Sequence, residues 1–236
     1  MTNTIGTLYG VSVGTGDPEL ITVKGLKLLQ NTSIIAFPAG INQQSGVAEK
    51  IITPWLNSQQ QKIPLNFPYV QEQSILEQAW QGAAETLWTY LNQGHDVVFA
   101  CEGDISFYST FTYLAQRLEQ QHPEAKIERI PGVCSPMAAC STLGIPLTVR
   151  EQRLVILPAL YTMSELEKAL DSAEVVVLMK VSSVYESVWK ILADRNLLKN
   201  AYIVEKATHL EEKIYRDLEQ SPNLKLSYFS ILIIQI

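Results

Sequence analysis

In three places this sequence predicts a buried strand that runs directly into a glycine-containing turn and then into the start of a helix. The strands are expected at residues 8–13, 96–101 and 126–130. Because the carboxyl ends of parallel strands meet at one edge of a sheet, the three turns should lie close together. We therefore expect a shared ligand crevice rather than three unrelated turns.

The first of these turns has the composition of a ligand-binding loop. Gly14 and Gly16 permit backbone conformations and close approaches that larger residues forbid. Asp17 followed by Pro18 is typical of a helix N-cap with proline at the first helical position, and the helix is expected to continue to about residue 29. Such a turn can present backbone N–H groups to a small polar ligand. A tight turn without a ligand is the alternative.

Strand and helix patterns alternate along the whole chain, which predicts an α/β fold with a mainly parallel sheet. Further helices are expected at residues 47–56 and 76–91 and from residue 106 onward, with a closing strand at 230–236. The glutamine-rich residues 57–62 are expected to form an exposed loop. Because the pattern restarts after Ile145-Pro146, we expect two domains, residues 1–145 and 146–236.

Charge and cysteine content limit the classes of function. The formal net charge is −6, which disfavours a broad nucleic-acid-binding surface. No segment has the length and apolar character of a membrane span, and the N-terminus does not resemble a signal peptide. Cys101, Cys134 and Cys140 form no CxxC pair, so we expect buried, inert thiols and a cytoplasmic protein. The three histidines lack metal-ligand spacing, and no metal site is expected.

The turns do not fit the usual phosphate-binding motifs. Glu19 stands where a dinucleotide fingerprint requires its third glycine, and no Gly-Lys-Ser/Thr motif follows a strand. The second turn carries Glu102 and Asp104, whose charges disfavour a phosphate and suit a neutral or cationic ligand. An adenosine that carries a sulfonium group fits this requirement.

Five ordered segments resemble the tetrapyrrole (corrin/porphyrin) methyltransferases. They are residues 10–25 (GVSVGTGDPELITVKG), 102–110 (EGDISFYST), 130–146 (IPGVCSPMAACSTLGIP), 177–180 (VLMK) and 204–208 (VEKAT). Within the family, residues 102–114 and 131–146 are most similar to the enzymes that methylate C20 of precorrin-2. One departure is Ile105, because many relatives have proline there, and a proline would have fixed the conformation of the second turn.

The resemblance implies two α/β domains, with a mainly parallel N-terminal sheet, a mixed C-terminal sheet and an active site in the cleft between them. It implies a homodimer that binds S-adenosyl-L-methionine and a tetrapyrrole. The implied cofactor-binding residues are Gly103, Asp104, Ser109, Thr110, Ser135, Met179 and Ala207. The implied substrate-binding residues are Gly14, Gly16, Lys24, Arg150 and Lys180, with Arg153 and Lys206 as further candidates for binding substrate carboxylates. Solvated surface charge is the alternative for each of these basic residues.

The implied reaction is methylation of C20 of precorrin-2 or of its cobalt-containing counterpart, a step of cobalamin biosynthesis. The ring carbon itself attacks the methyl group, so no protein nucleophile is required, but a proton must leave afterwards. Asp17, Glu102, Asp104 and Tyr108 are weak candidates for the proton acceptor. Each of three candidates has an alternative role. Asp17 can be a helix cap, Asp104 a turn residue or a cofactor contact, and Tyr108 a packing residue. Other open readings are methylation of uroporphyrinogen III or a later precorrin, and a non-catalytic ligand-binding homologue.

Overall fold

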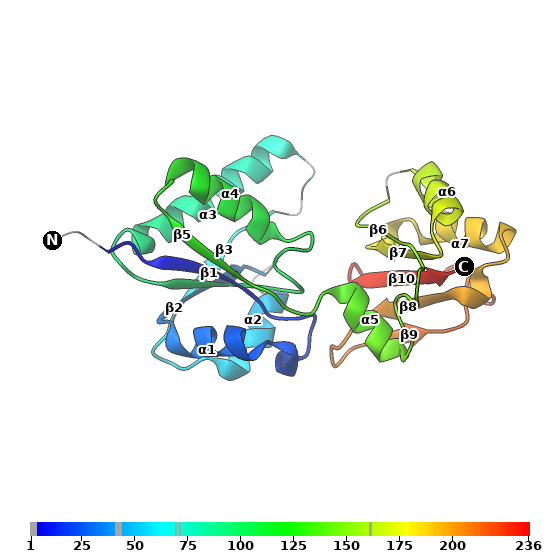
Figure 1. The fold of residues 1–236 in the computed structure, drawn as a ribbon, viewed down its shortest axis with the longest axis horizontal. Coiled ribbons are helices and arrows are strands. Elements are labelled where there is room, and N and C mark those ends of the chain that lie inside the picture. The colour runs from blue at the N-terminus through cyan, green and yellow to red at the C-terminus, as the bar shows by residue number, and fades with distance from the viewer. Residues whose placement is uncertain (1–3, 41–43, 69, 71, 161) are drawn as a thin grey trace. The chain divides into compact units, whose positions relative to one another are not determined.

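The computed structural model describes residues 4–40, 44–68, 70, 72–160 and 162–236. The chain divides into two compact units, Met1–Cys134 and Ser135–Ile236, and each contains one five-stranded sheet (Figure 1). One sheet is parallel and the other is mixed, which confirms the predicted fold class. The division places residues 135–145 with the second unit, whereas the sequence pattern grouped them with the first. The predicted boundary at residue 145 stays a prediction.

The first sheet has the strand order β3-β2-β4-β1-β5, and every neighbouring pair is parallel. Its strands are β1 (Thr7–Ser12), β2 (Ile34–Pro38), β3 (Gln61–Leu65), β4 (Val97–Cys101) and β5 (Lys126–Ile130). Its helices are α1 (Val23–Asn31), α2 (Val47–Ile52), α3 (Gln73–Leu91) and α4 (Thr110–Gln121). The turns after β1, β4 and β5 therefore lie at the same edge of the sheet, as predicted.

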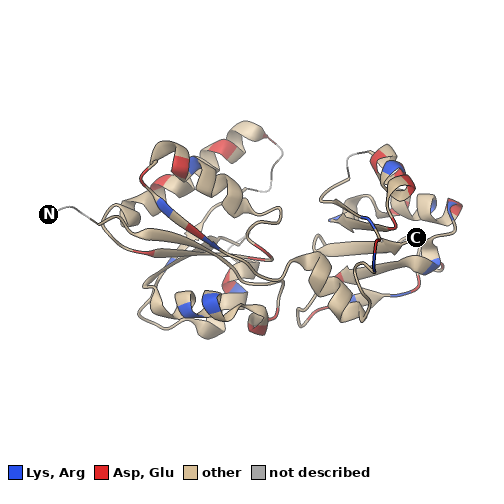
Figure 2. Cartoon of the chain, viewed as in Figure 1, with Lys and Arg blue, Asp and Glu red and all other residues tan. Residues whose placement is uncertain are grey.

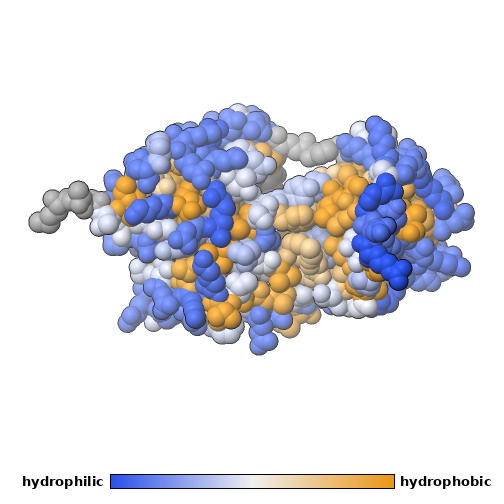
Figure 3. All heavy atoms as spheres, viewed as in Figure 1, coloured by the Kyte–Doolittle hydropathy of each residue, from blue (hydrophilic) through white to orange (hydrophobic). Residues whose placement is uncertain are grey.

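Helices cover both faces of the first sheet. In Figure 1, α1 and α2 lie on one face, and α3 and α4 lie on the other. Alternate residues of β4 enter the two cores: Phe99 packs with α3 and α4, whereas Val98 and Ala100 pack on the opposite face. Burial on both faces explains why β4 reads as a continuous apolar run. The outer surface around α3 and α4 is largely hydrophilic in Figure 3.

The structure corrects three local predictions in the first unit. Residues 57–62 do not form only a loop, because the edge strand β3 begins at Gln61. The helix after the first turn is interrupted: Asp17 caps only a short 3₁₀ turn, and α1 begins later with Thr22 as its N-cap. The helix expected from residue 106 begins at Thr110, because the Ser109 side chain caps its first turn.

The second sheet has the strand order β6-β7-β10-β8-β9. Its strands are β6 (Leu154–Leu157), β7 (Val175–Met179), β8 (Ala201–Glu205), β9 (Lys213–Tyr215) and β10 (Ser230–Gln235). β6 is parallel to β7, whereas β10 is antiparallel to both β7 and β8. The helices are α5 (Ser135–Leu143), α6 (Met163–Ser172) and α7 (Tyr185–Asp194). The predicted closing strand is therefore a central strand of this sheet, and its residues from Ser230 to Ile234 are buried.

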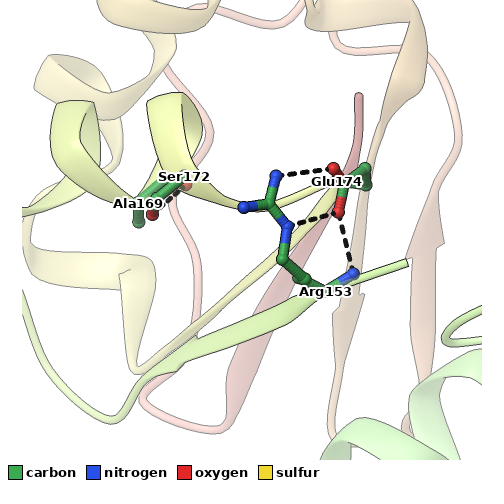
Figure 4. Close-up of polar contacts among 4 residues, drawn as sticks. All are labelled: Arg153, Ala169, Ser172 and Glu174. Carbon is green, nitrogen blue, oxygen red and sulfur yellow. Dashed lines mark hydrogen bonds and ion pairs between the residues drawn. The ribbon is translucent and has the colours of Figure 1, made fainter. Parts of the chain in front are cut away.

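Arg153 and Glu174 join the amino ends of β6 and β7 (Figure 4). The guanidinium of Arg153 donates two hydrogen bonds to the Glu174 carboxylate, 2.7 Å from Nη2 and 3.2 Å from Nε, and the Arg153 backbone N–H donates a third of 2.8 Å. Hydrogen bonds from Arg153 lower the pKa of Glu174 to about 2. Acidic and basic residues are otherwise interspersed over both units (Figure 2).

Candidate functional site

The first and second turns of the first unit are joined through two glycines. The Gly103 N–H donates a 2.7 Å hydrogen bond to the Gly14 carbonyl, and the Gly14 N–H donates one of 3.3 Å in return. Both glycines have positive φ values, +77° at Gly14 and +69° at Gly103. Left-handed backbone is readily adopted by glycine, so the sequence of each turn permits this pairing.

Ser12 connects the second turn to the end of β5. This residue ends β1 and is fully buried. Its hydroxyl donates a 2.7 Å hydrogen bond to the Ile130 carbonyl and accepts one of 2.7 Å from the Ile105 N–H. A proline at position 105 would have no N–H for this bond, so Ile105 permits the link to Ser12. Sequence reasoning did not select Ser12, although a serine that ends a buried apolar strand is a usable signal.

Asp104 connects the second turn to the third. One carboxylate oxygen accepts a 2.7 Å hydrogen bond from the Gly132 N–H, and the other accepts bonds from the Ser106 N–H and hydroxyl. Desolvation would raise the pKa of the Asp104 carboxyl, but hydrogen bonds from Ser106 and Gly132 outweigh it and hold that pKa below its usual range. The side chain is therefore ionised and engaged at both oxygens.

The glycines of the second and third turns differ in what surrounds them. A Cβ atom at Gly132 would lie 2.5 Å from the Cβ of Ser12, so this glycine is required for close packing within the site. A Cβ atom at Gly103 would meet no heavy atom within 4 Å. The backbone of Gly103 therefore borders open space, and it offers a surface that a ligand can approach closely.

The remainder of the second turn places Tyr108, Ser109 and Thr110 in different environments. Tyr108 has a φ of +50° and is 58% exposed, with its ring edge-to-face against Phe107. Ser109 is buried, caps α4 through the Phe111 N–H, and has its hydroxyl 3.0 Å from the Cys101 sulfur. Thr110 is the first residue of α4. Burial raises the pKa of the Cys101 thiol to about 12, which agrees with an inert side chain.

The other predicted residues of the first unit lie in its first turn and in the helix α1 that follows. The Asp17 side chain accepts a 2.8 Å hydrogen bond from the Glu19 N–H, as an N-cap does, and Gly16 directly precedes it. Lys24 lies in the first turn of α1, and its ammonium is 3.8 Å from the carboxylate of Glu128 on β5. The structure thus brings Gly14, Gly103 and Asp104 together and places Lys24 beside a strand.

In the second unit, two predicted cofactor residues lie at one edge of the sheet. Met179 ends β7, and Ala207 follows the end of β8. β7 and β8 flank β10, where Ile231 is paired with Met179 and Ser230 is paired with Glu205. Ser135, the third predicted cofactor residue of this unit, is instead the first residue of α5.

Three non-glycine residues at this edge of the second sheet have left-handed backbone conformations. Lys180 follows β7 with a φ of +54°, and Lys206 and Thr208 flank Ala207 with φ values of +48° and +66°. Such backbone is uncommon outside glycine and concentrates at binding sites. Lys206 is ion-paired with Glu211, whereas the Lys180 ammonium lies 5.3 Å from the centroid of the Tyr228 ring.

Glu205, at the end of β8, is a buried carboxylate that sequence reasoning missed. Its two oxygens accept hydrogen bonds of 2.9 Å from the Tyr215 hydroxyl and 2.5 Å from the Ser227 N–H. Desolvation would raise the pKa of Glu205, but the Ser227 and Tyr215 hydrogen bonds outweigh it and lower that pKa. Glu205 therefore ties the chain before β10 to β8.

The basic residues Arg150 and Arg153 are not part of this edge. Both precede β6, and Arg153 lies at the amino ends of β6 and β7 with its guanidinium bound to Glu174. Because β6 and β7 are parallel, this end is opposite the one that carries Met179 and Lys180. Arg150 has a φ of +52° and is exposed.

The described residues include neither a cluster of metal-ligating side chains nor a helix that could span a membrane. Among them, no group of three histidine, cysteine, aspartate or glutamate side chains is arranged to hold a metal ion. Across the same residues, no helix is both long enough and apolar enough to cross a membrane.

Comparison with known proteins places these features in a wider context. The sequence model of the family described as Tetrapyrrole (Corrin/Porphyrin) Methylases matches residues 7–222. The Cobalt-precorrin-2 C(20)-methyltransferase of Salmonella typhimurium is 31% identical, and the match covers 97% of this chain and 96% of that protein. Cobalamin biosynthesis protein CobIJ of Mycobacterium bovis is also 31% identical over 96% of this chain, but the chain spans only 45% of its length.

A solved structure shows the same fold. It is the uroporphyrin-III C-methyl transferase from Thermus thermophilus complexed with S-adenyl homocysteine, with a TM-score of 0.67 and 18% sequence identity. The match covers 98% of this chain and 97% of that one.

Proposed function

Because the chain belongs to the tetrapyrrole (corrin/porphyrin) methylase family, we propose that it transfers a methyl group from S-adenosyl-L-methionine to C20 of precorrin-2 or cobalt-precorrin-2. This is a step of cobalamin biosynthesis. The similarity to the Salmonella typhimurium protein supports this substrate, because it extends over nearly the full length of both chains. The observation that carries the proposal within the structure is the joining of three turns at one edge of the first sheet by Ser12, Asp104 and the Gly14–Gly103 pair.

The chemistry of these turns fits the proposed methyl donor. Residues 13–17 and 102–110 contain acidic side chains, and neither these turns nor residues 131–135 contain lysine or arginine. Such turns disfavour a phosphate group and favour a cation. S-adenosylmethionine has a sulfonium charge and no phosphate, and the open space beside Gly103 permits close approach to the backbone. The Thermus thermophilus structure of the same fold contains S-adenyl homocysteine, and this agrees with the assignment.

We assign the methyl donor to Gly103, Asp104, Ser109 and Thr110 of the first unit and to Ser135, Met179 and Ala207 of the second. Gly14, Gly16, Lys24, Arg150 and Lys180 stay the proposed substrate-binding residues. Lys180 has the strongest structural support among the basic candidates, because it is exposed at the same edge of its sheet as Met179 and Ala207.

When bound, S-adenosylmethionine supplies an activated methyl group for direct displacement by an electron-rich carbon. The residues of the chain must hold the two reacting molecules in line, and well-held geometry can supply roughly 7–11 kcal/mol of the barrier reduction. The hydrogen bonds of Ser12 and Asp104 connect the second turn to the end of β5 and to the third turn, which supports that task. Asp104 is a poor proton acceptor because both of its oxygens are engaged and its pKa is lowered. We therefore propose that it positions the turn.

We further propose that the protein acts as a homodimer in the cytoplasm. This rests on its resemblance to its family and on its cysteine pattern. Size-exclusion chromatography with light scattering tests the dimer, and fractionation of the source cells tests the compartment.

The proposed activity is tested with purified protein, S-adenosylmethionine and either metal-free or cobalt-containing precorrin-2. We expect one methyl group to be added, with nuclear magnetic resonance placing it at C20. Parallel reactions contain uroporphyrinogen III and later precorrins. Methylation of one of these and not of precorrin-2 would replace the proposed substrate. Binding of S-adenosylhomocysteine without turnover of any substrate would identify a ligand-binding homologue instead.

A further inference from the structure

Two exposed aromatic residues immediately before β10 have no assigned role. Tyr228 and Phe229 are 45% and 37% exposed. Their ring centroids are 5.3 Å apart at an interplanar angle of 88°, so the rings pack edge to face. We call this pair the aromatic shelf. Two adjacent exposed rings form an apolar surface that a flat ligand can contact.

The aromatic shelf lies at the edge of the second sheet that carries the proposed ligand residues. β10 begins at Ser230, between the carboxyl ends of β7 and β8, where its next residue is paired with Met179. The Lys206 N–H donates a 2.8 Å hydrogen bond to the Phe229 carbonyl. The shelf is therefore fixed to the strained segment that contains Ala207.

A cation is held over this shelf. The ammonium of Lys180 is 5.3 Å from the centroid of the Tyr228 ring, within the range of a cation–π interaction. Lys180 is exposed, and among the described residues no carboxylate lies within ion-pair distance of it. By contrast, Lys206 is ion-paired with Glu211, and both oxygens of Glu205 accept hydrogen bonds. Lys180 is thus a cation available to an anionic ligand at this edge.

We propose that Tyr228 and Phe229 bind a face of the tetrapyrrole, and that Tyr228 positions Lys180 to pair with one of its carboxylates. The inference rests on the proposed function and adds two residues that the sequence did not indicate, Tyr228 and Phe229. Flat conjugated rings stack favourably on aromatic side chains, and an ammonium pairs with a carboxylate at the rim of the ring. Lys180 contacts substrate in this arrangement, whereas Tyr228 both contacts substrate and orients Lys180.

The experiment measures binding of sirohydrochlorin, the oxidised form of precorrin-2, to the full-length protein by its change in absorbance. Tyr228→Leu, Phe229→Leu and Lys180→Gln should each weaken binding about tenfold. Tyr228→Phe retains the ring and should bind within about twofold of the wild type. The control is Tyr113→Leu, because Tyr113 is a similarly exposed aromatic residue, 47% exposed, on α4 of the first unit.

Coupling between Tyr228 and Lys180 separates a positioning role from a structural one. The double variant Tyr228→Leu/Lys180→Gln should weaken sirohydrochlorin binding by less than the product of the two single-variant factors. Each single change already disrupts the same interaction. The affinity for S-adenosylhomocysteine should stay within about twofold of the wild type in every variant.

Four outcomes would overturn the inference. Unchanged sirohydrochlorin affinity in the shelf variants would exclude the shelf alone, with the proposed function intact. A parallel loss of S-adenosylhomocysteine affinity would assign these residues to the cofactor or to the fold. A change of oligomeric state with substrate affinity retained would make the shelf an interface between copies. Failure of the wild type both to bind sirohydrochlorin and to methylate precorrin-2 would instead reject the shelf and the proposed function together.

Discussion

The carboxylate of Asp104 accepts a 2.7 Å hydrogen bond from the backbone N–H of Gly132, so one side chain holds the second and third turns of the first unit together. Its other oxygen is bound by Ser106 of its own turn. A carboxylate engaged in this way forms charge-assisted hydrogen bonds that fix the relative position of two loops. The arrangement makes Asp104 a structural centre of the candidate site.

Replacement of Asp104 with alanine should release the third turn and weaken S-adenosylhomocysteine binding by about tenfold or more. Isothermal titration calorimetry measures this affinity. The control is Asp217→Ala, because Asp217 is exposed in the second unit and accepts a local hydrogen bond from the Glu219 N–H. Equal affinities in the Asp104 variant and the wild type would show that the link between the turns is dispensable for the cofactor.

Ser12 and Ser230 offer a matched pair for measuring the value of a buried hydroxyl. Both residues are fully buried, but the Ser12 hydroxyl makes two hydrogen bonds and the Ser230 hydroxyl has no partner among the described residues. Ser12→Ala should destabilise the first unit by about 1–3 kcal/mol, because it leaves the Ile105 N–H and Ile130 carbonyl unsatisfied. Ser230→Ala should be neutral or slightly stabilising for the second unit.

Hydrogen exchange with mass spectrometry during urea titration follows the two units separately, so each alanine variant is compared in the unit that contains it. If Ser12→Ala lowered the free energy of unfolding no more than Ser230→Ala does, the Ser12 hydroxyl would not be a structural link.

Sequence reasoning was most successful where one local pattern determines the structure. β4 was predicted because burial on both faces makes its residues continuously apolar, and the three glycine turns were predicted from strand ends and glycines alone. β3 was missed because it is an edge strand that starts with Gln61 and Lys62 and contains Pro64, so it lacks the apolar run of a central strand.

The parts of the site that were missed depend on residues far apart in the sequence. Ser12 bonds to Ile105 and Ile130, and neither partner is indicated by the sequence around Ser12. Lys180 and Tyr228 meet because β10 is inserted between β7 and β8, a strand order that no local pattern specifies. In contrast, Asp104 was selected from its own turn, although its bond to Gly132 required the fold.

Alanine variants of Gly103 and Gly144 separate the effect of ligand contact from the effect of backbone strain. Both have positive φ values, +69° at Gly103 and +67° at Gly144, and neither would place a Cβ atom within 4 Å of another heavy atom. Alanine at either position should therefore cost a similar 1–2 kcal/mol or so of stability through left-handed strain. Only Gly103→Ala should also weaken S-adenosylhomocysteine binding by about tenfold, because its methyl group would occupy the open space beside the second turn.

Calorimetric binding and thermal unfolding of the two glycine variants provide the comparison. Equal loss of affinity in both would attribute the effect to stability, and loss in neither would remove Gly103 from the proposed cofactor site.

The three cysteines should react at different rates. Burial raises the pKa of Cys101 to about 12 and that of Cys140 to about 11, whereas Cys134 is half-buried. Iodoacetamide at about pH 8 should therefore alkylate Cys134 first, because the reactive thiolate forms at Cys101 and Cys140 are rare and shielded. Peptide mass spectrometry measures the labelling, with urea-unfolded protein as the control in which all three react. Labelling of Cys101 as fast as Cys134 would contradict the buried environment described for β4.

The Arg153–Glu174 pair predicts how the second unit responds to acid. The hydrogen bonds that Arg153 donates to Glu174 lower the pKa of Glu174 to about 2 in the folded state, below the ordinary value of 4.5 for a glutamate. The folded state therefore favours ionised Glu174, and the resulting stabilisation is fully present above about pH 4.5 and is lost as the pH falls toward 2. Both side chains are solvent-accessible, so the effect should be modest and should weaken as salt is added.

Glu174→Gln tests this pH dependence because it keeps the shape of the side chain and removes the titrating group. The unfolding midpoint of the second unit should fall less steeply between pH 4.5 and 2 in the variant than in the wild type. Glu186→Gln is the control, since Glu186 forms an exposed pair with Lys190 within one helix and makes a single side-chain hydrogen bond with it. Glu186→Gln should change the dependence of the unfolding midpoint on pH less than Glu174→Gln does. The reason is that Glu174 receives three hydrogen bonds from Arg153 and joins two strands. Identical slopes for the wild type and Glu174→Gln would mean that the pair does not contribute to acid stability, even though it connects β6 to β7.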